Sequence, residues 1–140
     1  MKILLAVDGS EYTRRMIDYV QTHRGLFDPA HDFTVLNVQM PLPHHAASVV
    51  GSQVTQEYYR EESQKIVDPV VAELQGQGLR ATGTWKHGHL GETIAEFAEQ
   101  GGYDLIVMGS HGHGALGRLV MGSVASRVLA HCKVPVLLVR

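Results

Sequence analysis

The strongest constraint on the fold is a pair of short runs that are apolar at almost every position. Residues 2–7 and 105–108 lack the polar alternation of a strand that faces water on one side. Runs of about four to eight such residues are typical of strands buried on both faces. The two runs therefore predict the centre of a parallel sheet that is covered by helices on both sides.

Segments with helical periodicity alternate with strand-like segments along the chain. Strands are expected at residues 2–7, 33–38, 79–87, 105–108 and 134–139, and helices at 11–23, 53–75, 92–100 and 123–131. This alternation predicts an α/β fold with a doubly wound five-stranded parallel sheet, because parallel strands need crossover helices. Without an internal repeat or a linker, one domain over residues 1–140 is expected.

Three segments carry local signals that predict a helix irregularity, an edge strand and a helix cap. Asp68-Pro69 lies inside the second helical segment, where proline removes a hydrogen bond, so we expect a kink or a break there. Residues 79–87 alternate polar and apolar side chains, which is typical of a half-exposed edge strand. Ser10 is expected to cap the first helix.

The last strand, residues 134–139, carries no charged side chain, yet Pro135 cannot donate a hydrogen bond within a sheet. An apolar edge must be covered or paired. Burial between helices would satisfy this strand. We favour the other solution, a homodimer in which two copies pair through residues 134–139 across a two-fold axis.

The stretch Val107–Ser126 combines an abrupt strand end, closely spaced glycines and a helix start. Gly109 follows the apolar run, and Gly122-Ser123 opens the last helical segment. Glycines let backbone N–H groups approach an anion, and a helix N-terminus adds unpaired donors. This order predicts a phosphate site, where Ser123 caps the helix or binds a phosphate or a metal. No lysine precedes Ser123, so this is not the common phosphate loop. The alternative to a phosphate site is simple turn chemistry, since glycines after a strand also serve turns.

The expected strand ends would place other polar groups near this loop. In an open α/β sheet, ligands bind beyond the carboxyl ends of the strands, where the strand order reverses. Asp8 follows the first strand, and Val38 ends the second. Together with the glycine loop they predict a nucleotide-sized cleft, in which Asp8 suits ribose hydroxyls or a metal and the Val38 backbone suits a purine edge.

Composition argues against several other classes of function. The net charge is −2 and the pI is about 6.5, so no basic surface for nucleic acid is expected. No apolar run approaches the roughly 20 residues of a membrane span, and the N-terminus does not resemble a secretion signal. A single cysteine, Cys132, allows no internal disulfide, which favours a reducing compartment and a cytoplasmic location.

The nine histidines do not favour a structural metal site. The pairs His44-His45, His87-x-His89 and His111-x-His113 lie in or beside expected turns, without a cysteine or carboxylate cluster. His111, His113 and Arg118 either donate to phosphates or belong to a solvated loop.

The spacing Gly109-x2-Gly112-x9-Gly122-Ser123 matches the ATP-binding signature of the universal stress protein family at every defined position. The first strand ending in Asp8 and the closing Val-Pro-Val strand also resemble that family, so the resemblance covers the whole chain. It implies a Rossmann-like sheet, similar to that of adenine nucleotide alpha hydrolases, with strand order 3-2-1-4-5, and a dimer contact through the last strand.

The resemblance also implies roles for individual residues. Asp8 corresponds to the acidic residue beside the adenosine, and Val38 to the position whose backbone meets adenine. Ala6 stands where some ATP-binding members have proline, and a backbone contact would serve there. The ribose and phosphates would be held by Met108, Gly109, Gly112, Gly122, Ser123 and Val124. Ser123 would also lie near a bound Mg²⁺ or Mn²⁺ ion.

We therefore expect a nucleotide-dependent regulatory module of the stress response. It would bind ATP, or ADP or AMP, act as a homodimer and report to an unknown protein partner through the dimer or through residues 40–52. One alternative is a slow Mg-dependent ATPase, slow because the loop offers no lysine and no evident base. The other is a stress-interaction dimer that binds no nucleotide.

Overall fold

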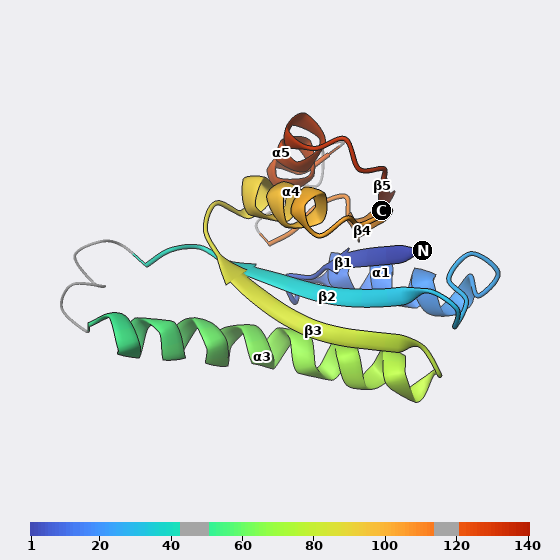
Figure 1. The fold of residues 1–140 in the computed structure, drawn as a ribbon, viewed down its shortest axis with the longest axis horizontal. Helices are drawn as coiled ribbons and strands as arrows, with labels where there is room; N and C mark the ends of the chain where they lie inside the picture. Colours follow the sequence, from blue (N-terminus) through green and yellow to red (C-terminus); the bar gives the residue numbers. More distant parts are fainter. Residues whose placement is uncertain (43–50, 114–120) are drawn as a thin grey trace.

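The computed structural model describes residues 1–42, 51–113 and 121–140. Its strands form one five-stranded sheet in the order β3-β2-β1-β4-β5, and all neighbouring pairs are parallel. The strands are β1 (Lys2–Ala6), β2 (Asp32–Gln39), β3 (Arg80–His87), β4 (Leu105–Gly109) and β5 (Val136–Val139). The predicted fold class and strand order are confirmed (Figure 1).

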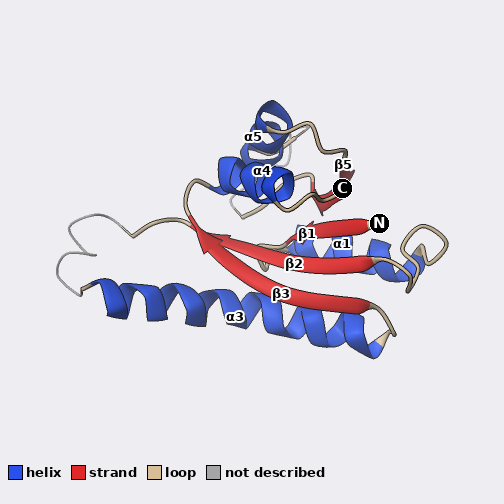
Figure 2. Cartoon of the chain, in the orientation of Figure 1, coloured by secondary structure: helices blue, strands red, loops and turns tan. Residues whose placement is uncertain are grey.

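Helices cover both faces of the sheet. They are α1 (Glu11–Thr22), α3 (Ser52–Gly76), α4 (Leu90–Gln100) and α5 (Ser123–His131). Figure 2 shows α1 and α3 on one side and α4 and α5 on the other. Side chains of β1 enter both cores: Ile3 and Leu5 pack in the first, and Leu4 packs in the second. Burial on both faces explains why this strand is apolar from Ile3 to Ala6, after the exposed Lys2.

The strand register brings three carboxyl ends together. Ala6 at the end of β1 lies opposite Leu36 of β2 and Met108 of β4. The chain passes from β1 to β2 on one side and later enters β4 on the other. The strand order therefore reverses beside β1, which is where an open α/β sheet leaves a crevice.

Of the kink or break expected at Asp68-Pro69, the break is not present. α3 runs as one α-helix of 25 residues with Pro69 inside it. Pro69 is exposed, while the neighbouring Val67 is buried and Ile66 and Val70 pack against the core. The packing of this apolar face holds the helix together across the hydrogen bond that proline lacks.

The two edge strands differ as their sequences predict. β3 is an edge strand with mostly exposed side chains and only Ala81 buried, which confirms the half-exposed strand. β5 is the opposite edge and pairs with β4 alone among the described residues. Pro135 precedes β5, and its carbonyl accepts a hydrogen bond from the Ile106 N–H at 2.9 Å. The first three side chains of β5 are half-buried.

Candidate functional site

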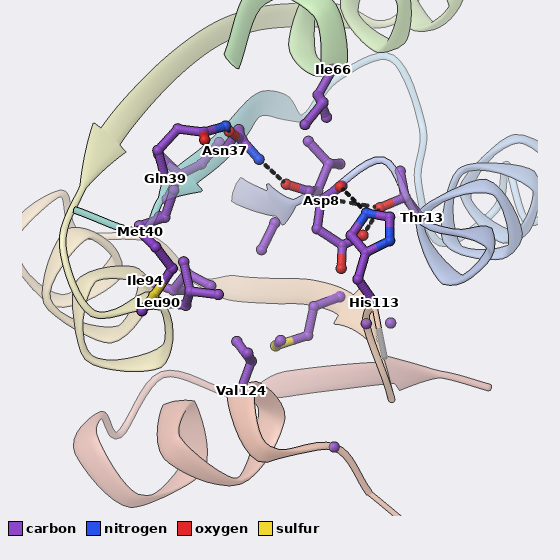
Figure 3. Close-up of a pocket in the computed structure, with 18 of the residues that line it drawn as sticks. Asp8, Thr13, Asn37, Gln39, Met40, Ile66, Leu90, Ile94, His113 and Val124 are labelled. Atoms are coloured by element: carbon purple, nitrogen blue, oxygen red, sulfur yellow. Dashed lines mark hydrogen bonds between the residues drawn. The ribbon is translucent and has the colours of Figure 1, made fainter. Parts of the chain in front are cut away.

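A cavity of about 670 Å³ lies at the carboxyl ends of β1, β2 and β4. All nine predicted site residues line it: Ala6, Asp8, Val38, Met108, Gly109, Gly112, Gly122, Ser123 and Val124. Figure 3 shows Asp8 and His113 on one side of the cavity, with Val124 and Ile94 across from Ile66. The fold thus brings together residues from four separated segments of the chain.

Asp8 is held in place by Thr13. The Thr13 hydroxyl accepts a hydrogen bond from the Asp8 N–H and donates one to Asp8 Oδ1, both at 2.9 Å. The Ser10 N–H donates to the same oxygen at 2.9 Å. The other oxygen, Oδ2, lies beside the glycine loop, because a Cβ atom built on Gly112 would be 2.6 Å from it. One oxygen of Asp8 therefore orders the turn, and the other faces the loop.

The predicted cap at Ser10 is only partly correct. Ser10 occupies the N-cap position of α1, but its hydroxyl makes no capping hydrogen bond and is buried without a partner among the described residues. The side chains of Asp8 and Thr13 order this turn instead.

The Val38 backbone faces the cavity side of β2. In a parallel strand, the N–H and C=O of one residue point to the same neighbour, and those of the next residue point to the other neighbour. The Leu36 carbonyl accepts from Val7 on the β1 side, and the Gln39 carbonyl accepts from Gly88 on the β3 side. The N–H and C=O groups of Val38 therefore point toward the β1 side, where β1 has already ended at Ala6. Among the described residues, no backbone hydrogen bond joins Val38 to the chain that follows β1.

The three described glycines of the loop, Gly109, Gly112 and Gly122, lie where other residues would be crowded. A Cβ atom on Gly109 would be 2.6 Å from Cβ of Tyr12, and one on Gly122 would be 3.1 Å from Cα of His111. The Gly122 N–H donates to the Ser110 carbonyl at 2.7 Å, which holds the residue before α5 beside the end of β4. Gly114, Gly117 and Arg118 of this loop lie outside the described residues.

The N-terminus of α5 opens on the cavity. Gly122 is its N-cap and Ser123 its first residue, so of the two roles considered for Ser123, that of helix cap is wrong. The Ser123 side chain is exposed, and it is free to serve a ligand because the cap position belongs to Gly122. The first N–H groups of a helix have no partner within it, and the helix dipole favours negative charge there.

The charges that line the cavity are unusual for a phosphate site. Among its described lining residues there is no lysine or arginine, and Asp8 and Glu62 are carboxylates. His113 donates from Nε2 to the Asp8 carbonyl at 2.8 Å, and the His111 ring lies 5.1 Å from that of Tyr12. Backbone N–H groups and imidazoles are therefore the anion-binding groups that this part of the chain provides.

No group of three or more histidine, cysteine, aspartate or glutamate side chains is placed to hold a metal ion in residues 1–42, 51–113 and 121–140. The pair His44-His45 lies outside these ranges. No helix in the same ranges is long and apolar enough to cross a membrane.

Sequence reasoning missed part of the site. Thr13 and Asn37 line the cavity, together with the apolar residues Leu36, Ile66, Leu90 and Ile94. Asn37 could have been found, because it is the polar residue within the otherwise apolar run Val35–Val38. The apolar residues resemble ordinary core positions, and only the assembled fold shows that they border a cavity.

The fold and the cavity define an α/β protein with a ligand crevice at the point where the strand order reverses. A model of the universal stress protein family matches residues 1–140. A universal stress protein from Methanocaldococcus jannaschii, MJ0531, is 31% identical over 140 residues, covering 99% of this chain and 81% of that protein. The chain therefore belongs to the universal stress protein family.

Solved structures agree with this assignment. The structure of MJ0577, also from Methanocaldococcus jannaschii, is 26% identical with a TM-score of 0.83, and the match covers 99% of this chain and 94% of that one. The universal stress protein from Archaeoglobus fulgidus, solved in complex with dAMP, is 20% identical with a TM-score of 0.71. That match covers 100% of this chain and 98% of that one, and at this identity it shows the shared fold.

Proposed function

We propose that the cavity binds an adenine nucleotide, ATP or its products ADP and AMP, and that the protein is a nucleotide-dependent regulatory module. The observation that carries the proposal is the meeting of all nine predicted residues in one cavity where the strand order reverses. The relative from Archaeoglobus fulgidus, which was solved with dAMP, supports an adenine nucleotide as the class of ligand.

The chemistry of the cavity favours one orientation of the nucleotide. The Val38 backbone and the apolar side chains Leu36 and Ile94 suit the purine. Asp8 Oδ2 suits the ribose hydroxyls, because an ionised carboxylate accepts hydrogen bonds. Gly112, Gly122 and the N-terminus of α5 suit the phosphates.

A divalent cation fits the triphosphate end of this cavity. The described lining residues include no lysine or arginine to neutralise phosphate charge. Mg²⁺ prefers oxygen ligands and usually combines one or two protein groups with phosphate oxygens. The exposed Ser123 hydroxyl provides such an oxygen at the start of α5. Mg²⁺ or Mn²⁺ would supply the charge that the protein side chains do not.

We also propose that the module acts as a homodimer through β5 and transmits nucleotide occupancy to a protein partner. β5 has one unpaired side among the described residues and is hydrogen-bonded to β4, whose end lines the cavity. The free thiol of Cys132 fits a reducing, cytoplasmic setting.

Calorimetric titration with ATP, in the presence and absence of Mg²⁺, tests the proposal. We expect saturable binding that weakens when EDTA removes the cation. Gly112→Ala should weaken binding, because its Cβ atom would lie 2.6 Å from Asp8 Oδ2, whereas Gly76→Ala adds a Cβ atom in open space and serves as the control. No binding at millimolar ATP would contradict the proposal. Rapid phosphate release that disappears in Asp8→Ala would favour an ATPase instead.

A further inference from the structure

Asn37 is a buried polar residue whose side chain joins three parts of the molecule. It is 2% exposed and lies near the end of β2. Its Nδ2 donates to the Val7 carbonyl at 2.8 Å, and its Oδ1 accepts from Ser63 Oγ of α3 at 3.0 Å and from Gln39 Nε2 at 2.7 Å. A buried amide with this many bonds needs an explanation beyond packing, because an apolar side chain would fill the space without the cost of desolvation.

The bond to Val7 replaces a bond of the sheet. On the β1 side, the Asp32 N–H donates to the Met1 carbonyl, and Ala6 lies opposite Leu36. If the pairing of β1 with β2 continued in this register by one more step, the Val38 N–H would donate to the Val7 carbonyl. The Asn37 side chain donates to that carbonyl, and no backbone hydrogen bond from Val38 to Val7 is present.

The orientation of the Asn37 amide is set by its neighbours. The Val7 carbonyl can only accept a hydrogen bond, so the NH₂ group must face it. The amide oxygen then faces the donors Ser63 and Gln39. A flipped amide would place its oxygen against the carbonyl of Val7 and its NH₂ group against the NH₂ group of Gln39.

We infer that Asn37 is a positioning residue that ends the pairing of β1 with β2 one step early. It thereby keeps the N–H and C=O groups of Val38 available to read the edge of a purine base. This inference rests on the proposed adenine nucleotide site. To the Val38 contact already proposed it adds the residue that keeps this contact available, and base selectivity reports on it, since a backbone N–H and C=O pair matches the N1 acceptor and the 6-amino donor of adenine.

Base selectivity gives the test, measured as the ratio of the dissociation constants for ITP and ATP. Inosine carries a donor at N1 and an acceptor at position 6, the reverse of adenine. We expect the wild-type chain to prefer ATP by about tenfold or more, the effect of a mismatched buried polar pair. In Asn37→Leu, the Val38 N–H becomes free to donate to Val7, and the ratio should fall to about one.

Thr34→Val is the matched control. Thr34 also lies in β2, and its hydroxyl accepts a hydrogen bond from the Tyr103 hydroxyl at 2.9 Å, but it does not line the cavity. The change removes one side-chain hydrogen bond from the same strand and should leave the ratio unchanged. If both variants lose selectivity equally, or if Asn37→Leu retains it, the inference is wrong. A wild type that binds ATP and ITP equally contradicts the inference alone, whereas a wild type that binds neither contradicts the proposed function as well.

Amide hydrogen exchange of the wild-type protein provides a measurement that does not depend on the folding of Asn37→Leu. In the nucleotide-free protein, the Val38 amide should exchange much faster than the Leu36 amide, which lies in the paired part of β2. Addition of ATP should slow exchange at Val38 selectively. Strong protection of Val38 without nucleotide would show that its N–H is already bonded and would overturn the inference.

Discussion

At the scale of single residues, the two oxygens of Asp8 have separate tasks. Oδ1 accepts hydrogen bonds from the Ser10 N–H and the Thr13 hydroxyl, while Oδ2 lies beside Gly112. Structure and binding can therefore be separated by a substitution that changes only the second oxygen.

Asp8→Asn makes this separation. Its Oδ1 can still accept both hydrogen bonds, while an NH₂ group replaces Oδ2 and cannot accept bonds from ribose hydroxyls. We expect the melting temperature to change little and the affinity for ATP to fall about tenfold or more, the cost of mismatched polar groups. Calorimetry and thermal unfolding measure the two effects.

Asp8→Ala is the companion variant. It removes both oxygens, so it should also destabilise the fold by about 1–2 kcal/mol, as the loss of a helix-start hydrogen bond does. If Asp8→Asn binds ATP as tightly as the wild type, Asp8 does not contact the nucleotide.

The site residues that could be predicted from the sequence are those at the carboxyl ends of strands. Asp8, Val38 and Gly109 could be placed because each lies at the end of a recognisable strand, and parallel strands end at one edge. The roles of Thr13 and Asn37 could not be predicted in the same way. Their hydrogen bonds depend on the exact turn after β1 and on how α3 lies against β2, which no local pattern specifies.

At the scale of elements, the close packing of α4 on α5 positions the helix start at the cavity. A Cβ atom on Gly91, in the first turn of α4, would overlap Cβ of Arg127 and lie 3.0 Å from the Val124 carbonyl. The missing side chain allows the two helices to approach where α5 begins.

Gly91→Ala should separate α4 and α5. We expect a loss of about 1–3 kcal/mol in the free energy of unfolding, as for other overpacked sites, and weaker ATP binding because the N-terminus of α5 moves. Urea unfolding and calorimetry measure these effects. The control is Gly76→Ala, where nothing lies within 4 Å of the added Cβ atom. A Gly91→Ala variant as stable as the control would show that the helices adjust without cost.

The elements themselves were largely predictable, and the exceptions have physical causes. Strand and helix types followed from periodicity, and the predicted bounds 123–131 of the last helix agree with those of α5. Of the kink or break expected at Pro69, the break was wrong, because local preference counts for less than the apolar face that α3 buries on the sheet.

At the scale of the whole molecule, the backbone of β5 offers a surface for a second copy. The Pro135 carbonyl accepts a hydrogen bond from the Ile106 N–H of β4, and the Val139 carbonyl accepts one from the N–H of Ser110, the residue after β4. By the alternation of a parallel strand, the N–H and C=O groups of Val136 and Leu138 point away from β4. An edge of this kind is a template for pairing with another chain.

Val136→Pro should therefore weaken the proposed homodimer. Proline removes an outward N–H group without removing a hydrogen bond to β4, and edge strands tolerate it. We expect a shift from dimer to monomer in sedimentation experiments, with the circular dichroism spectrum preserved. Val136→Thr keeps the N–H group and should remain dimeric. A wild type that is monomeric at high concentration would contradict the dimer directly.

The cavity is assembled from residues near both ends of the chain, Asp8 among them at one end and Val124 at the other. Unfolding any central part of the sheet would abolish it, so a bound ligand would oppose global unfolding and not only local opening. A ligand at one hundred times its dissociation constant adds about 2.7 kcal/mol to the stability of a protein that binds it only when folded. Under the proposed function, the survival of each molecule against proteases would rise and fall with the supply of adenine nucleotide, and its abundance would record that supply.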